Sequence, residues 1–194
     1  SSISSGLSTA QALVATQVAA AAGAMTWLII ESYHQGKATA LGFASGILAG
    51  LVAVTPAAGV VQPYGALALG ILASCICYLA IQVKNKMGYD DSLDAFGIHG
   101  VGGIAGALLL TFFIRPSWMK EASEAAGGVW TTFQQLGVQA LAVAIAIAYS
   151  AAMTLVIVYL LNKVIPLRSS GEDEMAGLDR TYHGERGYGM LNPS

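Results

Sequence analysis

Apolar and polar residues follow one another along this chain in long blocks rather than at alternating positions. Five blocks are almost wholly apolar, and short polar or turn-forming stretches separate them. A helix that crosses the hydrocarbon core of a bilayer needs about 20 mostly apolar residues. The pattern therefore predicts five membrane helices, with approximate bounds Leu7–Ile30, Ala38–Val54, Tyr64–Val83, Ser92–Ile114 and Phe133–Val164.

The separating stretches predict how the chain is organised. "TPAAG" (Thr55–Gly59) should break the second helix from the third. The loop Arg115–Thr132 has no recognisable motif, and we expect it to be irregular. The segment after the fifth helix is rich in Gly and charge. We expect a transmembrane region at residues 1–164 and a cytoplasmic tail at residues 165–194.

The composition agrees with a membrane protein. Of 194 residues, 55% are hydrophobic and only 10% are charged, whereas about a quarter of the residues of a soluble domain are charged. Open sheets cannot satisfy their backbone in lipid, so the fold class should be an all-α membrane protein. Four stretches contain no Asp, Glu, Lys or Arg: Ser1–Ile30, Ala38–Val83, Ala95–Ile114 and Ala125–Asn162.

Glycines at helical spacing predict close helix packing. Gly42, Gly46 and Gly50 are four residues apart, as are Gly102 and Gly106. Small residues at this spacing let helix backbones approach closely in lipid. The chain should form a tightly packed bundle.

The distribution of positive charge predicts the orientation. Loops on one side and the tail hold seven Lys and Arg residues, and the other side holds two, Arg115 and Lys120. The side richer in Lys and Arg is normally cytoplasmic, so the C-terminus should lie in the cytoplasm of a multi-pass cell membrane protein. The net charge of −2 does not favour a nucleic-acid partner. Because the chain begins with Ser inside an apolar stretch, we expect a segment of a longer protein and see no signal peptide.

The two cysteines carry little chemistry. Cys75 and Cys77 are two residues apart on a predicted helix, so they should point to different sides. They are typical of small packing residues rather than of a disulfide or a metal site. No metal or other cofactor is expected, and haem ligation lacks a second intramembrane histidine.

One histidine stands out. His99 is the single ionisable residue well inside any predicted helix, about seven residues from the start of the fourth. An ionisable residue at such a place marks an ion path, a proton relay or a ligand site, or else a neutral ring bonded to a carbonyl of the next helix. At helical spacing its face carries Ala95, Phe96, Gly102, Gly103 and Gly106. Most of these residues have little or no side chain, which predicts either a close neighbouring helix or an open lumen in front of His99.

Two aspartates precede this histidine by eight and five residues. Asp91 suits the N-cap of the fourth helix, and Asp94 suits its first turn, where a carboxylate is favourable to the helix dipole. The alternative is that a carboxylate orders a vestibule for a cation.

Four stretches in order resemble the ammonium transporters, the Amt branch of the Amt/Rh family. "YDDSLDAFGIHGVGG" (Tyr89–Gly103) resembles the signature around the second pore histidine of that family. "ATQVAAAAGAMTW" (Ala15–Trp27) and "ATALGFASGILAGLVAVTPAAG" (Ala38–Gly59) resemble its seventh helix and its eighth. "GLDRTYHGERGYG" (Gly177–Gly189) is similar to its C-terminal tail. The resemblance implies helices seven to eleven of an eleven-helix fold, that is, the second inverted repeat and the final helix.

The resemblance also implies roles for individual residues. His99 matches the second histidine of a hydrogen-bonded pore pair, which would stay neutral and bind substrate or relay protons. Asp91 and Asp94 match the two aspartates of that motif, and Ala95 matches a small pore-lining residue. The resemblance implies transport of ammonium or ammonia for nitrogen uptake, by a homotrimer in the cell inner membrane.

The tail is expected to be regulatory. In the family this segment couples the subunits and meets a PII-type regulator. The local sequence "SSGEDE" (Ser169–Glu174) is also typical of a disordered acidic tail. The residues that match the family's tail are Gly177, Leu178, Asp179, His183, Gly184, Glu185 and Tyr188.

Two other functions compete with transport, and the chain is otherwise not expected to be an enzyme. One is an ammonium sensor, in which a transporter-like domain binds without transporting. The other is an intramembrane serine protease, with Ser45 as nucleophile and His99 as base. The protease reading is weak because Phe43 stands where its motif requires Gly.

Overall fold

The computed structural model describes residues 6–125, 131–165 and 167–185. The elements of these residues are helices, joined by one isolated antiparallel bridge between Val61 and Ile114. The chain divides into two compact units, residues 1–144 and 145–194, and each is described by itself. The sequence predicted a division at residue 164, between the transmembrane region and the tail. That boundary concerns the membrane rather than compactness, so it stays a prediction.

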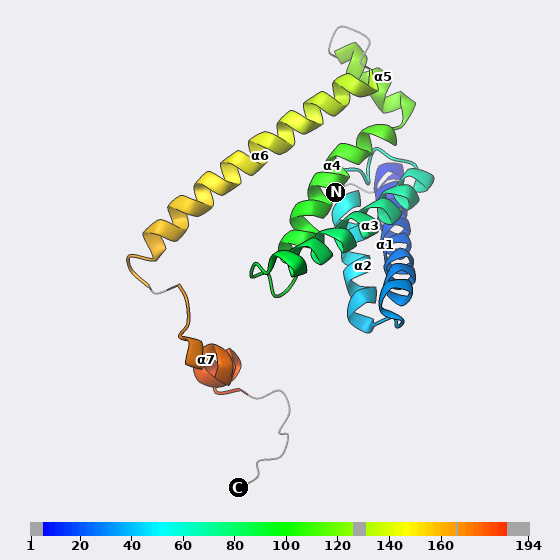
Figure 1. Cartoon of the computed structure of the whole chain (residues 1–194). Helices are drawn as coiled ribbons and strands as arrows, with labels where there is room; N and C mark the ends of the chain where they lie inside the picture. The colour runs from blue at the N-terminus through cyan, green and yellow to red at the C-terminus, as the bar shows by residue number, and fades with distance from the viewer. Residues whose placement is uncertain (1–5, 126–130, 166, 186–194) are drawn as a thin grey trace. The chain divides into compact units, whose positions relative to one another are not determined.

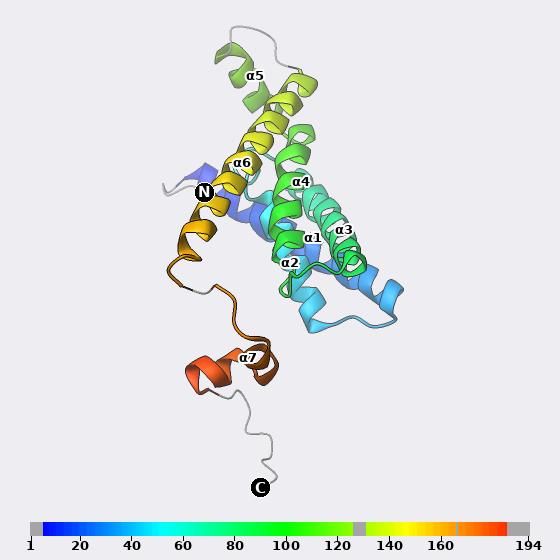
Figure 2. The same ribbon diagram turned by 60° about the vertical axis from the view of Figure 1, so that its left-hand side comes forward.

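The first unit is a bundle of helices that lie side by side (Figures 1 and 2). It contains α1 (Leu7–Gln35), α2 (Ala40–Val54), α3 (Pro63–Met87) and α4 (Val101–Leu109). A π-helical turn, η1 (Phe96–Gly100), precedes α4, and a 3-10 turn, η2 (Leu110–Phe112), follows it. α5 (Pro116–Ala125) comes next, and α6 (Thr132–Leu161) runs into the second unit.

The structure confirms a helix at each of the five predicted positions. In the described residues, three are long and apolar enough to cross a membrane, namely α1, α3 and α6. The second and fourth are shorter apolar helices, at Ala40–Val54 and Phe96–Phe112. As predicted, α2 ends just before "TPAAG", and α3 begins at Pro63, where proline favours the first turn of a helix.

The structure corrects the prediction for the loop between the fourth and fifth predicted helices. It was expected to be irregular, but Pro116–Ala125 forms α5. Pro116 occupies the first helical position, where its missing N–H costs nothing. Arg115, just before it, donates from its backbone N–H to Val60 O at 3.0 Å and from Nη2 to Gly59 O at 2.9 Å. These bonds attach the start of α5 to the α2–α3 connection.

Small residues form the contacts between the helices, as the glycine spacing predicted. A methyl group at Gly50 would overlap Ala19 O of α1, and one at Gly46 would lie 2.6 Å from the Cβ of Trp27. On α4, a methyl group at Gly106 would lie 2.6 Å from the Cα of Ala53 on α2. Backbones this close leave no room for a side chain, so these glycines fix the helix positions.

The second unit contains the remainder of α6 and two short helical segments. α7 (Gly171–Ala176) is capped by Ser170, whose Oγ accepts from Asp173 N at 3.1 Å. The π-turn η3 (Asp179–His183) follows it and ends at Gly184, whose φ is +68°. The acidic stretch at Ser169–Glu174 is therefore helical over most of its length. The structure does not support the disorder that its composition suggested.

Candidate functional site

The predicted pore histidine lies in a turn of unusual geometry. Residues Phe96–Gly100 form a π-helical turn, in which the backbone N–H of Val101 donates to Phe96 O. Such turns are rare and occur often at functional sites. Helical structure begins at Ala95, not at Ser92 as predicted. His99 therefore lies four residues from the start of the helix rather than seven.

The carboxylate of Asp91 caps this turn. Its Oδ1 accepts from Ala95 N at 2.9 Å, and its Oδ2 accepts from Phe96 N at 3.0 Å. The first N–H groups of a helix have no partner within the helix, and an anion there is also favoured by the helix dipole. Both oxygens of Asp91 are used in this way, which matches the capping interpretation rather than a free carboxylate in a vestibule.

Asp94 has a different role from the one expected in a first turn. Its φ of +54° is a left-handed conformation, which is unfavourable for most residues but tolerated by Asp. Its Oδ1 accepts from Lys84 Nζ at 2.5 Å, and the same ammonium donates to Asp91 O at 2.9 Å. Lys84, at the end of α3, thus holds both aspartates of the motif, and its side chain is only 12% exposed.

The residues just before His99 attach the turn to the core. Ile98 is buried with Trp27, Ala49, Cys77, Tyr78 and Ile81. The thiol of Cys77 donates to Ile98 O at 3.8 Å, which gives that carbonyl a partner in addition to the helix. Gly97 is buried so closely that a methyl group would lie 2.9 Å from Ile81 Cγ1.

His99 itself points away from this core. It is exposed, and no hydrogen bond or ion pair joins its imidazole to any other described residue of the chain. Ala95 and Phe96 are exposed as well. An ionisable ring fixed by a buried neighbour but left without a partner is available for a ligand or for another part of the protein.

The face predicted for His99 differs from the observed one. Gly102 and Gly106 were expected to share the face of His99, but both are buried, against Cys77 and Ala53. The π-turn adds one residue to a turn of helix, so side chains before and after it change register. As a result the glycines face α2 and α3, and the imidazole does not.

A second polar cluster lies where α1 ends and α2 begins, and it was missed in the sequence. Glu31 is 6% exposed, and its carboxylate accepts from Thr39 N and Thr39 Oγ1, both at 2.9 Å. Near it, His34 Nδ1 lies 2.7 Å from the hydroxyl of Tyr78 on α3. In the sequence, this cluster could have been recognised only from Glu31 and from Thr39, which lies eight positions later, just before an apolar helix.

The residues matched to the family's tail lie in and around η3. Gly177 precedes the turn with φ +90°, Gly184 ends it, and Glu185 N donates to Asp179 O at 2.9 Å. Leu178 and His183 belong to the same turn. Tyr188 lies outside the described residues.

The comparison with known proteins decides the family. The sequence model of the Ammonium Transporter Family matches residues 1–188. The chain belongs to the ammonium transporter family. A relative named "Ammonium transporter" from Aquifex aeolicus is 43% identical over 94% of the chain, and one from Bacillus subtilis is 39% identical over 91%.

Solved structures of ammonium transporter relatives have the same fold. Saccharomyces cerevisiae Mep2 matches 87% of the chain with a TM-score of 0.74 and 33% identity. A structure described as "Sensor Amt Protein" matches 90% with a TM-score of 0.78 and 29% identity. The chain is thus an all-α membrane protein of this fold.

The chain spans less than half the length of these proteins. It covers 42% of the Aquifex relative and 39% of the Mep2 chain. This share fits the five helices out of eleven that the resemblance implied.

The protease alternative finds no support in this geometry. In the described part of the chain, no hydrogen bond joins Ser45 to His99. The matched relatives carry names of transporters rather than of enzymes.

The cap on the π-turn leads to a first prediction. Replacing Asp91 by Ala should lower the free energy of unfolding by about 1 kcal/mol, since two N–H groups lose their acceptor. Unfolding of the purified protein by SDS in mixed micelles measures this change. Asp90→Ala, which removes the neighbouring exposed carboxylate, is the control and should have less than half the effect. Equal effects of the two substitutions would contradict the capping role.

Proposed function

We propose that this chain forms part of a membrane pathway for ammonium, which crosses as neutral ammonia while its proton follows separately. The observation that carries the proposal is the exposed imidazole of His99, which has no partner among the described residues, on a chain of the ammonium transporter family. Relatives of the chain are named ammonium transporters, and the chain covers only part of them. The activity therefore belongs to the whole protein.

The physical case rests on the cost of moving a charge through an apolar passage. A bare cation loses its hydration there at a cost of several kcal/mol or more. If the proton is removed before the narrow part, the remaining ammonia needs hydrogen-bond partners but no counter-charge. A neutral imidazole supplies one donor and one acceptor without bringing a charge of its own.

In this proposal, His99 pairs with a histidine that the family's first repeat supplies. One ring donates while the other accepts, and the pair either orients ammonia or relays the proton. Ala95, one turn before His99, lines the passage. Asp91, Asp94 and Lys84 keep the π-turn in place at the mouth, with Asp91 in a structural role. The bonds described above support this division of roles.

Transport by the full-length protein in liposomes tests the proposal. On a solid-supported membrane, an ammonium pulse should give a transient current that saturates with ammonium concentration, whereas an equal pulse of sodium gives none. Liposomes without protein are the control. A well-folded preparation that gives no current above that control would refute transport.

An ammonium sensor is the second candidate, because one structural match is described as a sensor. A sensor would bind ammonium without carrying it. Binding of ammonium measured by calorimetry, together with absent current, would favour the sensor. Current and binding at similar concentrations would favour the transporter.

We also propose that the tail is a regulatory segment of a homotrimer in the cell inner membrane, with its C-terminus in the cytoplasm. The excess of Lys and Arg on one side supports that orientation. A PII-type protein is the proposed partner at the cytoplasmic face. The ordered turn at η3 and its two glycines with positive φ give that partner a defined shape to bind.

A substitution at the end of η3 tests the tail. Gly184→Val places a β-branched residue at φ +68°, so the turn should open and binding of a purified PII protein should weaken by about tenfold or more. Surface plasmon resonance on the full-length protein measures the affinity. Gly171→Val is the control, because Gly171 has no atom within 4 Å of an added methyl group and no positive φ. Unchanged affinity in Gly184→Val would exclude η3 from the binding surface.

A further inference from the structure

The exposed side of the π-turn carries a large apolar side chain, that of Phe96. Among the residues of η1, Gly97 and Ile98 are buried, whereas His99 and Phe96 are exposed, Phe96 to 57%. A phenyl ring thus lies on the same side of the turn as the imidazole. The role proposed above for His99 does not use this ring.

Three contacts fix the position of the ring. The backbone N–H of Phe96 donates to Asp91 Oδ2 at 3.0 Å, and its carbonyl oxygen accepts from Val101 N. The ring itself lies against Gly100, where an added methyl group would be 2.8 Å from Phe96 Cδ2 and 2.9 Å from Cε2. Because Gly100 has no side chain, the ring can lie beside the residue that directly follows His99.

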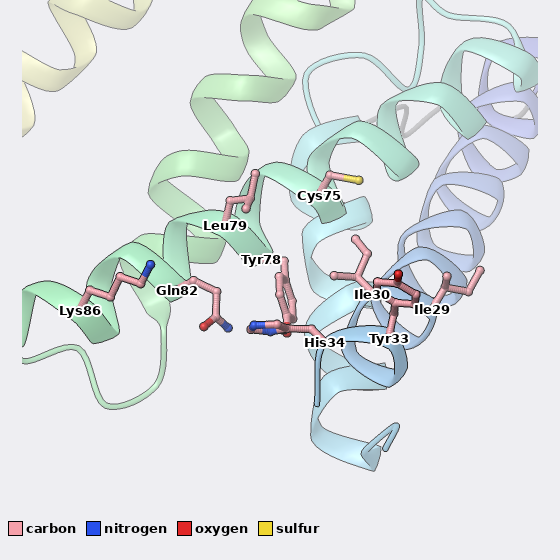
Figure 3. Close-up of a pocket in the computed structure, with 9 residues that line it drawn as sticks. All are labelled: Ile29, Ile30, Tyr33, His34, Cys75, Tyr78, Leu79, Gln82 and Lys86. Carbon is pink, nitrogen blue, oxygen red and sulfur yellow. The ribbon is translucent and has the colours of Figure 1, made fainter. Parts of the chain in front are cut away.

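The other aromatic rings near the turn lie elsewhere. Trp27 and Tyr78 belong to the buried core that holds the turn, and they are 4% and 5% exposed. Figure 3 shows Tyr78 on α3 directed toward His34 on α1, and the Tyr78 hydroxyl lies 2.7 Å from His34 Nδ1. Within the described turn, the apolar surface beside His99 therefore comes from Phe96.

The surroundings of the ring favour the entry of water and cations. Asp91 and Asp94 precede it directly, and Lys84 is the one cation that binds them among the described residues, so the mouth keeps a net negative charge. Such a charge attracts cations. On the other side of the ring, the exposed imidazole of His99 is polar and holds water. A passage that is wet at both places carries hydrated ions, whereas an apolar constriction between them excludes water.

We propose that Phe96 is a specificity-determining residue, whose ring excludes hydrated alkali cations from the passage. A metal cation would have to give up its water at the ring, which is costly, whereas ammonia passes without charge. The inference rests on the proposed ammonium pathway and adds the residue that makes this pathway selective. Potassium is the ion that tests it, because potassium has nearly the size and charge of ammonium but no proton to release.

The experiment compares potassium and ammonium currents of the full-length protein in liposomes. Equal pulses of the two ions are applied on a solid-supported membrane, and the ratio of the potassium current to the ammonium current is measured. The unaltered protein should give a potassium current no larger than that of empty liposomes. Phe96→Ala should raise the ratio by about tenfold or more, since the side chain that excludes water is lost. Phe96→Leu keeps apolar bulk and should restore the exclusion.

A second variant moves the ring without removing it. Gly100→Ala places a methyl group where the ring now lies, and the ring is the movable end of a side chain. The φ of Gly100 is −66°, which suits Ala, so this variant should fold. It should raise the ratio in the same direction as Phe96→Ala, and it decides the case if Phe96→Ala does not fold.

Phe112→Ala is the matched control. Phe112 is exposed to a similar degree, 54%, on η2 of the same apolar segment but outside the π-turn, and its loss should leave the ratio unchanged. An unchanged ratio in both Phe96→Ala and Gly100→Ala would overturn the proposal. An equal rise in Phe112→Ala would do so as well, since it would show general loosening. Absence of any ammonium current in the unaltered protein would instead refute the pathway itself, so the two failures are distinguishable.

Discussion

Replacing His99 by Ala should abolish the ammonium-dependent current of the full-length protein. The imidazole is exposed and has no partner in the described part of the chain, and Ala removes both its donor and its acceptor. Groups that transfer protons in enzymes typically contribute about 10²–10⁴-fold. A loss of that size would bring the current to the level of empty liposomes. Solid-supported membrane electrophysiology at saturating ammonium measures it.

Two comparisons sharpen this experiment. Leu93→Ala truncates an exposed side chain of the preceding turn and should leave the current intact. Uptake of neutral ammonia, followed by the internal pH of the liposomes, separates the two roles of the ring. A relay predicts that ammonia uptake persists without current, whereas an orienting role predicts that both are lost. Unaltered current in a folded His99→Ala protein would end the proposed role of the histidine.

Replacing Gly106 by Ala should strongly destabilise the bundle. The added carbon would overlap Ala53 O and lie 2.6 Å from Ala53 Cα, so it meets backbone rather than a movable side chain. α2 and α4 must then separate. Overpacking of this kind costs about 1–3 kcal/mol, and contact with backbone favours the upper end. Unfolding by SDS in mixed micelles gives the difference.

Gly103→Ala is the matched control on the same helix. The nearest atom to its added methyl group is Val52 Cγ1 at 4.0 Å, which is ordinary contact. Ala also favours a helix over Gly by about 1 kcal/mol, so this variant should be neutral or slightly more stable. If both variants unfold alike, the close approach of α2 and α4 at Gly106 is not what holds the bundle.

Much of the fold was accessible from the sequence because lipid imposes strong constraints on it. Long apolar blocks predicted the five helices, and the glycine spacing predicted the contacts made by Gly46, Gly50 and Gly106. Helix ends were harder. α3 continues to Met87, beyond the apolar block, because Lys84 and Lys86 are themselves good helix formers. The fourth helix begins late because Asp91 takes up its first N–H groups from outside.

The site was less accessible for a specific reason. His99 and the two aspartates could be picked out by their chemistry. No sequence periodicity marks a π-turn, however. The extra residue in that turn changes which side chains share a face of the helix. The partner of Asp94 could not be predicted from the sequence either. In the sequence, Lys84 is a positive charge at the end of a membrane span, and only the folded chain brings it to Asp94. Glu31 reads as the first residue of a loop, although it is buried.

The short distance in sequence between Glu31 and Thr39 has a consequence for biosynthesis. A carboxylate that enters the membrane without partners is costly. Here both acceptor oxygens are satisfied by a residue only eight positions later, and closing so small a loop costs little entropy. The carboxylate of Glu31 can therefore find both of its donors as soon as Thr39 has left the ribosome. This carboxylate does not have to wait for α3 or α4 to be satisfied when α1 enters lipid.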